Sequence, residues 1–113
     1  MKIEKLDDTP TERVAFKLRS ARKVPNVSGC YILTSAYRDI LYIGRAVNIH
    51  RRLLGHLDNK LKTNPTSCPP PRYFYYLSTD EIEKLEDKWL RIYQAKEGLL
   101  PPLNKIQASM PSI

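Results

Sequence analysis

The chain has 113 residues and a formal net charge of +7, from nineteen Lys and Arg against twelve Asp and Glu. This length fits one domain with a modest core. Two cysteines are too few for a disulfide framework, and no apolar run approaches the roughly 20 residues of a transmembrane helix. We expect a soluble, cytoplasmic protein with no membrane partner, because the first residues also lack the apolar core of a signal peptide.

The positive charge is clustered in two stretches. Residues 12–23 contain Glu12 as their single acid, and residues 45–62 contain Asp58 as theirs. Basic domains commonly bind polyanions such as nucleic acids. Charge alone fits a merely basic soluble protein equally well.

The first 25 residues (1–25) are expected to form an arm and a basic helix. Residues 1–10 are polar and end in Thr9-Pro10, which favours extended chain. A helix over residues 11–23 would place its apolar side chains on one side, and Pro25 would end it. The basic side chains of this helix are Arg13, Lys17, Arg19, Arg22 and Lys23.

Two runs of strand-forming residues follow and predict a β-hairpin. They cover residues 29–33 and 39–44 and are joined by a polar stretch. If Tyr31 pairs with Tyr42, the two phenols stand on the same face of the hairpin, close together.

Two further elements come next. Residues 49–57 are predicted to form a helix with Asn48 as its N-cap. Prolines predict a loop over residues 58–71, and an aromatic run predicts a third strand over residues 72–77.

The longest helix is expected to begin at Ser78. Ser78 and Glu81 have the spacing of a capping box, and the helix should run to about Lys96 and end at Gly98. Residues 99–104 contain two prolines and should form a stiff return segment.

This order of elements predicts an α+β fold. We expect residues 26–105 to form one domain with a small three-stranded antiparallel sheet flanked by helices. The basic helix is an N-terminal addition to it, and residues 106–113 are a loosely held tail.

One carboxylate of the longest helix lies on its apolar side. Glu86 falls between Tyr93 and Leu90 at 100° per residue. A buried, unpaired carboxylate is strongly unfavourable, so Glu86 requires a cation. That cation is either an arginine of the basic helix, in a structural ion pair, or a bound metal ion.

The helix over residues 49–57 has a similar pattern. Arg52 and His56 lie one turn apart at the flank of its apolar side and should be half-buried, whereas Arg51 points away. Each has an alternative without a functional role: a charged residue at the rim of the helix contact for Arg52, and an ordinary interfacial histidine for His56.

Over residues 28–104 the sequence resembles the GIY-YIG nuclease domain. Gly29-Cys30-Tyr31 is similar to the GIY element, with Cys in place of Ile, and Tyr42-Ile43-Gly44 is the YIG element. The replacement is mild because the Cys30 side chain faces away from the two tyrosines. Further matches follow in the family's order at Arg52, His56, Glu86 and Asn104.

The resemblance implies a metal-dependent endonuclease that hydrolyses phosphodiester bonds in DNA. Glu86 would hold a single Mg²⁺ or Mn²⁺ ion, and Arg52 would bind the scissile phosphate. The resemblance favours Tyr31 as the base, with Tyr42 as its partner. His56 competes for that role because an unperturbed histidine titrates near pH 6.5.

Three other residues are candidate substrate ligands. A free tyrosine is a poor base near neutrality, so Arg45 or the metal would have to lower the tyrosine pKa. Arg45 and Arg51 are candidate contacts to the substrate. Asn104 is expected to hold the end segment against the site. The alternative is that Asn104 is only a turn residue after two prolines.

DNA is the expected partner, with RNA or single-stranded DNA as alternatives. Specificity would come from residues 1–25, the proline-rich loop, a homodimer or a protein partner. Two other functions stay open: a nucleic-acid-binding module of the same fold that does not cleave, and an adaptor whose basic face meets an acidic protein.

Overall fold

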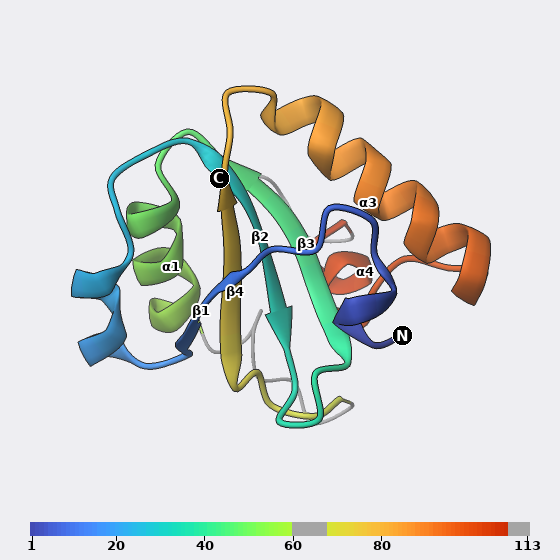
Figure 1. Cartoon of the computed structure of the whole chain (residues 1–113). Helices are drawn as coiled ribbons and strands as arrows, with labels where there is room; N and C mark the ends of the chain where they lie inside the picture. Colours follow the sequence, from blue (N-terminus) through green and yellow to red (C-terminus); the bar gives the residue numbers. More distant parts are fainter. Residues whose placement is uncertain (60–67, 109–113) are drawn as a thin grey trace.

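A four-stranded antiparallel sheet with strand order β1-β4-β2-β3 forms the centre of the molecule (Figure 1). The structure is a computed structural model that describes residues 1–59 and 68–108. The strands are β1 (Glu12–Ala15), β2 (Gly29–Thr34), β3 (Ile40–Ala46) and β4 (Tyr73–Ser78). The helices are the 3₁₀-helices η1 (Ile3–Lys5) and η2 (Leu18–Lys23) and the α-helices α1 (Ile49–Asp58), α3 (Ile82–Glu97) and α4 (Pro102–Ala108).

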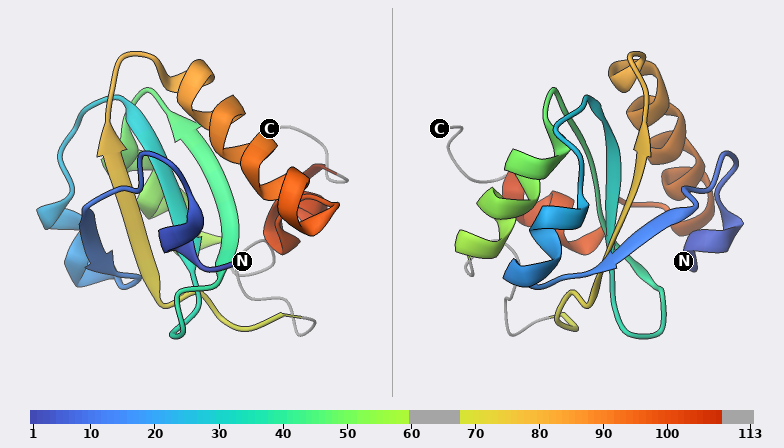
Figure 2. Two further views of the ribbon diagram at one scale, coloured as in Figure 1. Left: turned by 45° about the vertical axis from the view of Figure 1, so that its right-hand side comes forward. Right: turned by 60° about the vertical axis from the view of Figure 1, so that its left-hand side comes forward.

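Helices cover both faces of the sheet, so the domain has three layers (Figure 2). Because strand side chains alternate between faces, the core divides into two clusters. The first cluster, under α1, η2 and α4, is centred on Tyr31, Leu33, Leu53, Phe74 and Leu103. The second, under α3 and η1, is centred on Ile3, Ile32, Ile43, Trp89 and Tyr93. The α+β class is confirmed.

The sheet has a fourth strand where a basic helix was expected. Residues 12–15 form β1, which pairs with β4 in the register Val14 to Phe74, and only residues 18–23 are helical, as η2. The expectation of a helix over residues 11–23 is therefore wrong. Without β1, the backbone groups along one side of β4 would lack partners, and pairing satisfies them.

The β-hairpin is confirmed, but its register differs from the expected one. Tyr31 pairs with Gly44, and Tyr42 pairs with Leu33. The shift is by two residues, and an even shift keeps both phenols on the same face of the sheet. Cys30 lies in the second core cluster, on the opposite face, as expected.

Helix α1 begins as predicted. The backbone N–H of Arg51 donates to Asn48 Oδ1 at 2.9 Å, so Asn48 is the N-cap. The helix continues to Asp58, one residue into the predicted loop over residues 58–71. Residues 60–67 of that loop lie outside the described residues.

Helix α3 begins four residues later than the capping box predicted, at Ile82. Ser78 is the last residue of β4 and pairs with Gly29 of β2, so it is unavailable as a cap. The side chain that serves the turn is Thr79, whose Oγ1 accepts from the backbone N–H of Glu81 at 3.0 Å. At the other end, Gly98 has φ of 78°, the left-handed conformation predicted to end the helix.

The return segment contains a helix that was not predicted. Pro102 opens α4, a position where proline is favoured because the first helical N–H groups have no partner in the helix. Asn104 lies within α4, and residues 106–108 of the expected tail belong to this helix. Residues 109–113 of that tail lie outside the described residues.

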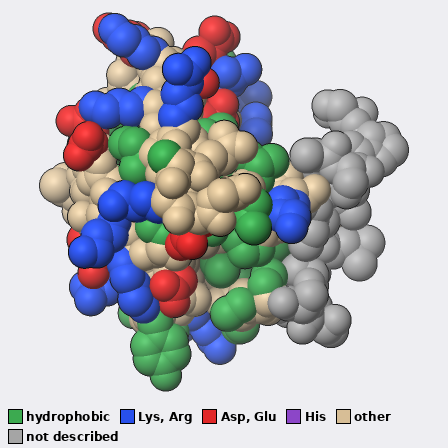
Figure 3. Space-filling view, turned by 90° about the vertical axis from the view of Figure 1, so that its right-hand side faces the viewer, with side chains coloured by type: hydrophobic (Ala, Val, Ile, Leu, Met, Phe, Trp, Pro, Cys, Tyr) green, Lys and Arg blue, Asp and Glu red, His purple; other side chains and the backbone are tan. Residues whose placement is uncertain are grey.

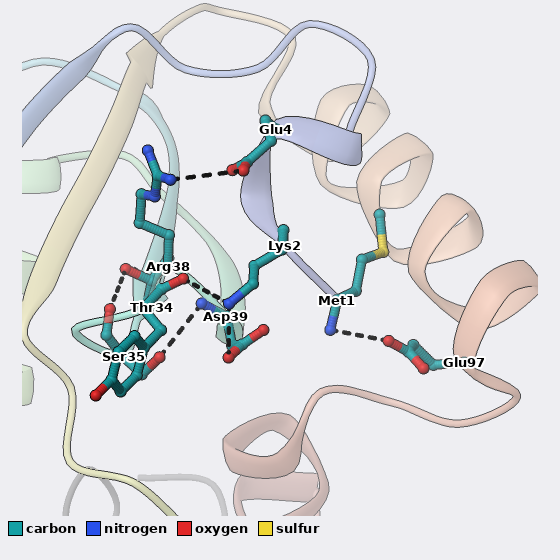
Figure 4. Close-up of polar contacts among 9 residues, drawn as sticks. Met1, Lys2, Glu4, Thr34, Ser35, Arg38, Asp39 and Glu97 are labelled. Atoms are coloured by element: carbon teal, nitrogen blue, oxygen red, sulfur yellow. Dashed lines mark hydrogen bonds and ion pairs between the residues drawn. The ribbon is translucent and has the colours of Figure 1, made fainter.

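The first residues are part of the fold, in contrast to the extended arm expected over residues 1–10. Ile3 and Leu6 are buried under the sheet. Figure 4 shows the polar contacts of this segment: Lys2 Nζ lies 3.2 Å from Asp39, and the Met1 amino group lies 2.8 Å from Glu97. In the described part of the chain, every helix is too short or too polar to cross a lipid bilayer.

Candidate active site

Tyr31 of the GIY-like element and Tyr42 of the YIG element lie side by side under α1, as predicted for their phenol groups. The ring centroids of Tyr31 and Tyr42 are 5.7 Å apart. Gly44 makes this approach feasible, because a Cβ atom at this position would lie 2.6 Å from atoms of both rings. Phe74 of β4 stacks on the other side of Tyr31, with centroids 5.1 Å apart. Gly44 therefore has a steric role that the YIG pattern alone does not reveal.

His56 of α1 lies against both tyrosines. Its Nε2 lies 2.7 Å from the hydroxyl oxygen of Tyr31, and its ring meets both tyrosines edge-on. The histidine, expected to be half-buried, is buried. Its hydrogen bond joins residues 25 positions apart in the chain, from α1 and β2.

Arg51 and Arg52 lie on the same helix, α1, and both are exposed. Arg52 was expected to be half-buried. The helix presents Ile49, Leu53 and His56 to the sheet, which leaves Arg52 at the margin of the contact. Its charge acts on both phenols, since Arg52, and not Arg45, opposes the rise that burial causes in the pKa of Tyr31 and of Tyr42.

Burial is the dominant influence on both phenols. It raises the pKa of Tyr31 well above 10, and the adjacent phenol of Tyr42 adds to this shift. Burial also raises the pKa of Tyr42; interactions with Tyr31 and Arg52 oppose that rise, and the negative charge of Glu86 adds to it. Both side chains are therefore protonated at neutral pH. Tyr42 is the more accessible, at 9% exposure against 0% for Tyr31.

Glu86 of α3 approaches the same group of residues. Its side chain is 22% exposed, and Oε1 lies 3.6 Å from the guanidinium Nη1 of Arg45 on β3. The cation beside Glu86 is thus Arg45, and not an arginine of residues 11–23, and it offsets the burial of the carboxylate only in part. Burial raises the pKa of Glu86 above its ordinary value, whereas Arg45 and Arg52 oppose that shift.

Asn104 holds α4 against the outer edge of β3. Its Nδ2 donates to the carbonyl of Ile43 at 2.9 Å, and its Oδ1 accepts from the N–H of Ile43 at 2.9 Å. The expectation that Asn104 fixes the end segment near the site agrees with this geometry. A direct contact with substrate stays a prediction, since both amide atoms already bind backbone.

The residues present suit a cation that takes few protein ligands. Within residues 1–59 and 68–108, no three His, Cys, Asp or Glu side chains gather as a metal-ligand set. Glu86 supplies a hard, partly exposed carboxylate oxygen, and burial without a full counter-charge makes a further cation favourable. Mg²⁺ commonly binds through one or two carboxylates and keeps several waters.

The structure therefore brings Tyr31, Tyr42 and His56 into contact and pairs Glu86 with Arg45. The charge of Arg52 acts on the two phenols and on Glu86, and Asn104 of α4 binds Ile43 of β3. Sequence reasoning identified Gly44 in the YIG element but not its steric role, and it missed Phe74 as a supporting residue. The sequence signal for Phe74 is its place in the continuous aromatic run of β4, where it pairs with Leu33 of β2. The sequence matches no protein-family model and no curated protein.

Proposed function

We propose that this protein is a divalent-metal-dependent endonuclease of the GIY-YIG type that hydrolyses phosphodiester bonds in DNA. One geometric observation carries the proposal: His56 of α1 lies against Tyr42 of β3, with ring centroids 5.0 Å apart, and Glu86 of α3 lies 3.6 Å from Arg45 of β3. These residues come from α1, α3 and β3, which are distant in sequence. Phosphodiester hydrolysis requires this combination of an anion clamp, a metal ligand and groups that handle protons.

Arg52 binds the scissile phosphate, because its planar guanidinium matches two phosphate oxygens. It is exposed and adjacent to the phenols, so a phosphate bound there lies next to Tyr42. Arg51, also exposed on α1, contacts the neighbouring backbone of the substrate. Arg45 holds the Glu86 carboxylate in place from β3.

Glu86 would hold Mg²⁺ or Mn²⁺, which supplies Lewis-acid polarisation of the phosphate and lowers the pKa of water. Tyr42, the more exposed phenol, orients the attacking water. The attack forms a bond from the water oxygen to phosphorus and breaks the bond to the leaving oxygen, which takes a proton from solvent. Tyr31 and His56 act as one unit: as the Tyr31 phenol oxygen accepts the proton of the attacking water, the Tyr31 proton passes to Nε2 of His56. The 2.7 Å hydrogen bond supports this transfer, and the raised pKa of Tyr31 disfavours a free phenolate.

The ion pair between Arg45 and Glu86 is the observation that would favour the second function, a nucleic-acid-binding module that does not cleave. In such a module, Glu86 would serve only as the structural partner of Arg45. However, the two charges are 3.6 Å apart and the Arg45 side chain is 45% exposed. An ion pair of this kind contributes about 0–1 kcal/mol to the stability of the fold, which is a weak reason to keep a partly buried carboxylate.

Cleavage of labelled DNA tests the proposal. Single-stranded, duplex and branched DNA, and RNA, are incubated with Mg²⁺, Mn²⁺ or EDTA. We expect cleavage that EDTA abolishes, and a loss of about 100-fold or more for Glu86→Gln and for Arg52→Ala. Glu83→Gln and Arg91→Ala change exposed charges on α3 and should cut normally. Full activity of a folded Glu86→Gln protein would exclude the metal role, and DNA binding without cleavage by the unmodified protein would favour the binding module.

A further inference from the structure

A second basic surface lies at the edge of the sheet opposite β3. There, β1 and η2 border a hollow of about 560 Å³. The charged residues that line it are Arg13, Lys17, Arg19, Arg22 and Lys23. Among the described residues around this hollow, which we call the β1 groove, none is acidic.

The short helix η2 aligns two of these cations. A 3₁₀-helix has three residues per turn, so side chains at i and i+3 project in the same direction. Arg19 and Arg22 have this spacing, and both are exposed. They form a pair of guanidinium groups along one side of the β1 groove.

Aromatic side chains extend the β1 groove. The guanidinium of Arg13 lies 4.5 Å from the ring centroid of Tyr73. A second hollow, of about 410 Å³, shares Arg13 and Tyr73 and adds Tyr37. Lys2 and Arg38 also line it, but they are paired with Asp39 and Glu4, at 3.2 and 3.8 Å. Tyr37 is 79% exposed at the tip of the β-hairpin. Cations and an accessible ring thus occur together, as on surfaces that bind nucleic-acid backbone and stack on bases.

The α3 side of the molecule has a different charge distribution. Its cations are paired with acids: Lys88 Nζ lies 2.7 Å from Asp8, and Arg91 Nε lies 2.8 Å from Asp87. Figure 3 shows blue and red side chains next to each other on this side. The surplus of positive charge therefore concentrates on the β1 groove and α1.

Helix α1 connects the β1 groove to the candidate active site. His50 Nδ1 donates to the carbonyls of Ala21 and Val24, at 2.8 and 3.0 Å, and so fixes η2 against α1. The exposed Arg51 and Arg52 lie on the same helix. Across the sheet, β1 and β3 are separated by three strand spacings, or about 14 Å. A nucleic-acid strand covers that distance in about four nucleotides.

We infer that the β1 groove is a second binding surface for the sugar-phosphate backbone of the nucleic acid whose scissile phosphate lies at Arg52. This inference rests on the proposed function and names the part of the protein that holds the substrate away from the cut. Arginine is suited to it because its fork binds phosphate through two hydrogen bonds. Contacts of this kind position a nucleic acid without reading its sequence.

The test compares two double variants with equal loss of charge. Arg19→Ala/Arg22→Ala removes two cations of the β1 groove, and Lys5→Ala/Lys96→Ala removes two exposed cations elsewhere. Affinity for labelled single-stranded and duplex DNA is measured in EDTA by fluorescence anisotropy over a range of salt concentrations. We expect the groove variant to bind about tenfold more weakly and its salt slope to fall by about 2, with the control variant unchanged.

The outcomes separate this inference from cleavage. Weaker binding and a lower slope for the groove variant alone support the inference, whether or not the protein cuts. Equal binding by both variants, with DNA cut by the unmodified protein, overturns the inference and leaves the nuclease intact. If polyglutamate displaces DNA as effectively as unlabelled DNA of the same charge, the occupant is an acidic polypeptide and the inference is wrong. Absence of any salt-dependent DNA affinity overturns both proposals.

Discussion

Glu86 carries a stability cost that its neighbours only partly offset. Its pKa is raised above 4.5, chiefly by burial. A carboxyl with a higher pKa in the folded chain stabilises the fold when protonated. This contribution is complete below the unfolded pKa and is lost as pH rises through the folded pKa. At neutral pH, therefore, the ionised Glu86 makes the fold less stable than a neutral side chain would.

We predict that Glu86→Gln raises the urea midpoint of unfolding at pH 7. This gain in the midpoint should disappear at pH ~3, where most carboxyls are protonated. Glu83→Gln, at an exposed position of the same helix, should show no such dependence. Addition of Mg²⁺ should raise the midpoint of the unmodified protein and leave that of Glu86→Gln unchanged. A Mg²⁺ response equal in both proteins would contradict the role of Glu86 as a ligand.

Tyr31 and His56 form a unit whose members should be inseparable in function. If the phenol proton moves to His56, loss of either partner interrupts the same step. We predict that Tyr31→Phe, His56→Gln and the double variant lose similar amounts of activity, because residues that act together are not additive. Tyr37→Phe, which removes a hydroxyl at an exposed tyrosine, is the control. Losses that multiply in the double variant would show independent roles.

Gly44 is a glycine because two rings occupy the space of a side chain. We predict that Gly44→Ala destabilises the fold by about 1–3 kcal/mol, since an added Cβ meets Tyr31 and Tyr42 at 2.6 Å. Gly55 in α1 has nothing within 4 Å of an added Cβ, so Gly55→Ala should stabilise the helix by about 1 kcal/mol. Urea denaturation of the pair measures both effects, and equal stabilities would contradict the steric argument.

At the scale of the elements, α4 packs on the sheet through Leu103 and is hydrogen-bonded to it through Asn104. Asn104 forms two hydrogen bonds with Ile43 of β3. We predict that Asn104→Ala costs about 1–3 kcal/mol and speeds hydrogen exchange at the Ile43 amide, because that N–H loses its acceptor. Lys105→Ala, at the next and exposed position of α4, should leave both unchanged. Unaltered exchange at Ile43 would show that α4 is held by other contacts.

Local patterns predicted most of the elements and failed where distant pairing decided the outcome. The hairpin and α1 follow from alternation and from the Asn48 cap, which are local signals. Residues 12–15 became a strand because β4 offers an edge, and β4 is distant in the sequence. Ser78 failed as a cap for the same reason, since its pairing with Gly29 keeps it in β4.

The residues of the candidate site were predictable where they depart from the pattern expected for their helix or strand. Glu86 is identified by its place among apolar residues, and Tyr31 and Tyr42 by their places in the GIY-like and YIG elements, each two residues from a glycine. The partners of these residues were not predictable. The contacts of Glu86 with Arg45, and of Tyr31 with His56, depend on how α3 and α1 pack on the sheet, which no local pattern contains.

At the scale of the whole molecule, the first residues complete the second core cluster. Ile3 is 2% exposed and packs with residues of β3 and α3. We predict that Ile3→Ala lowers the stability by about 2–5 kcal/mol, as for other buried large-to-small changes. Lys5→Ala, which is exposed in the same segment, should have little effect on the thermal midpoint. Similar midpoints for the two variants would show that this segment is dispensable for the fold.

The outer edge of β3 has a consequence for self-association. An unpaired edge strand can template the addition of another chain and so lead to aggregation. Here the backbone of Ile43 is occupied by the Asn104 amide, and further along the same edge Lys2 forms a β-bridge with Asp39. Two segments from opposite ends of the described chain therefore shield this edge. A pair of chains that assembles to break both strands of a duplex would have to do so through a surface other than continuation of the sheet at β3.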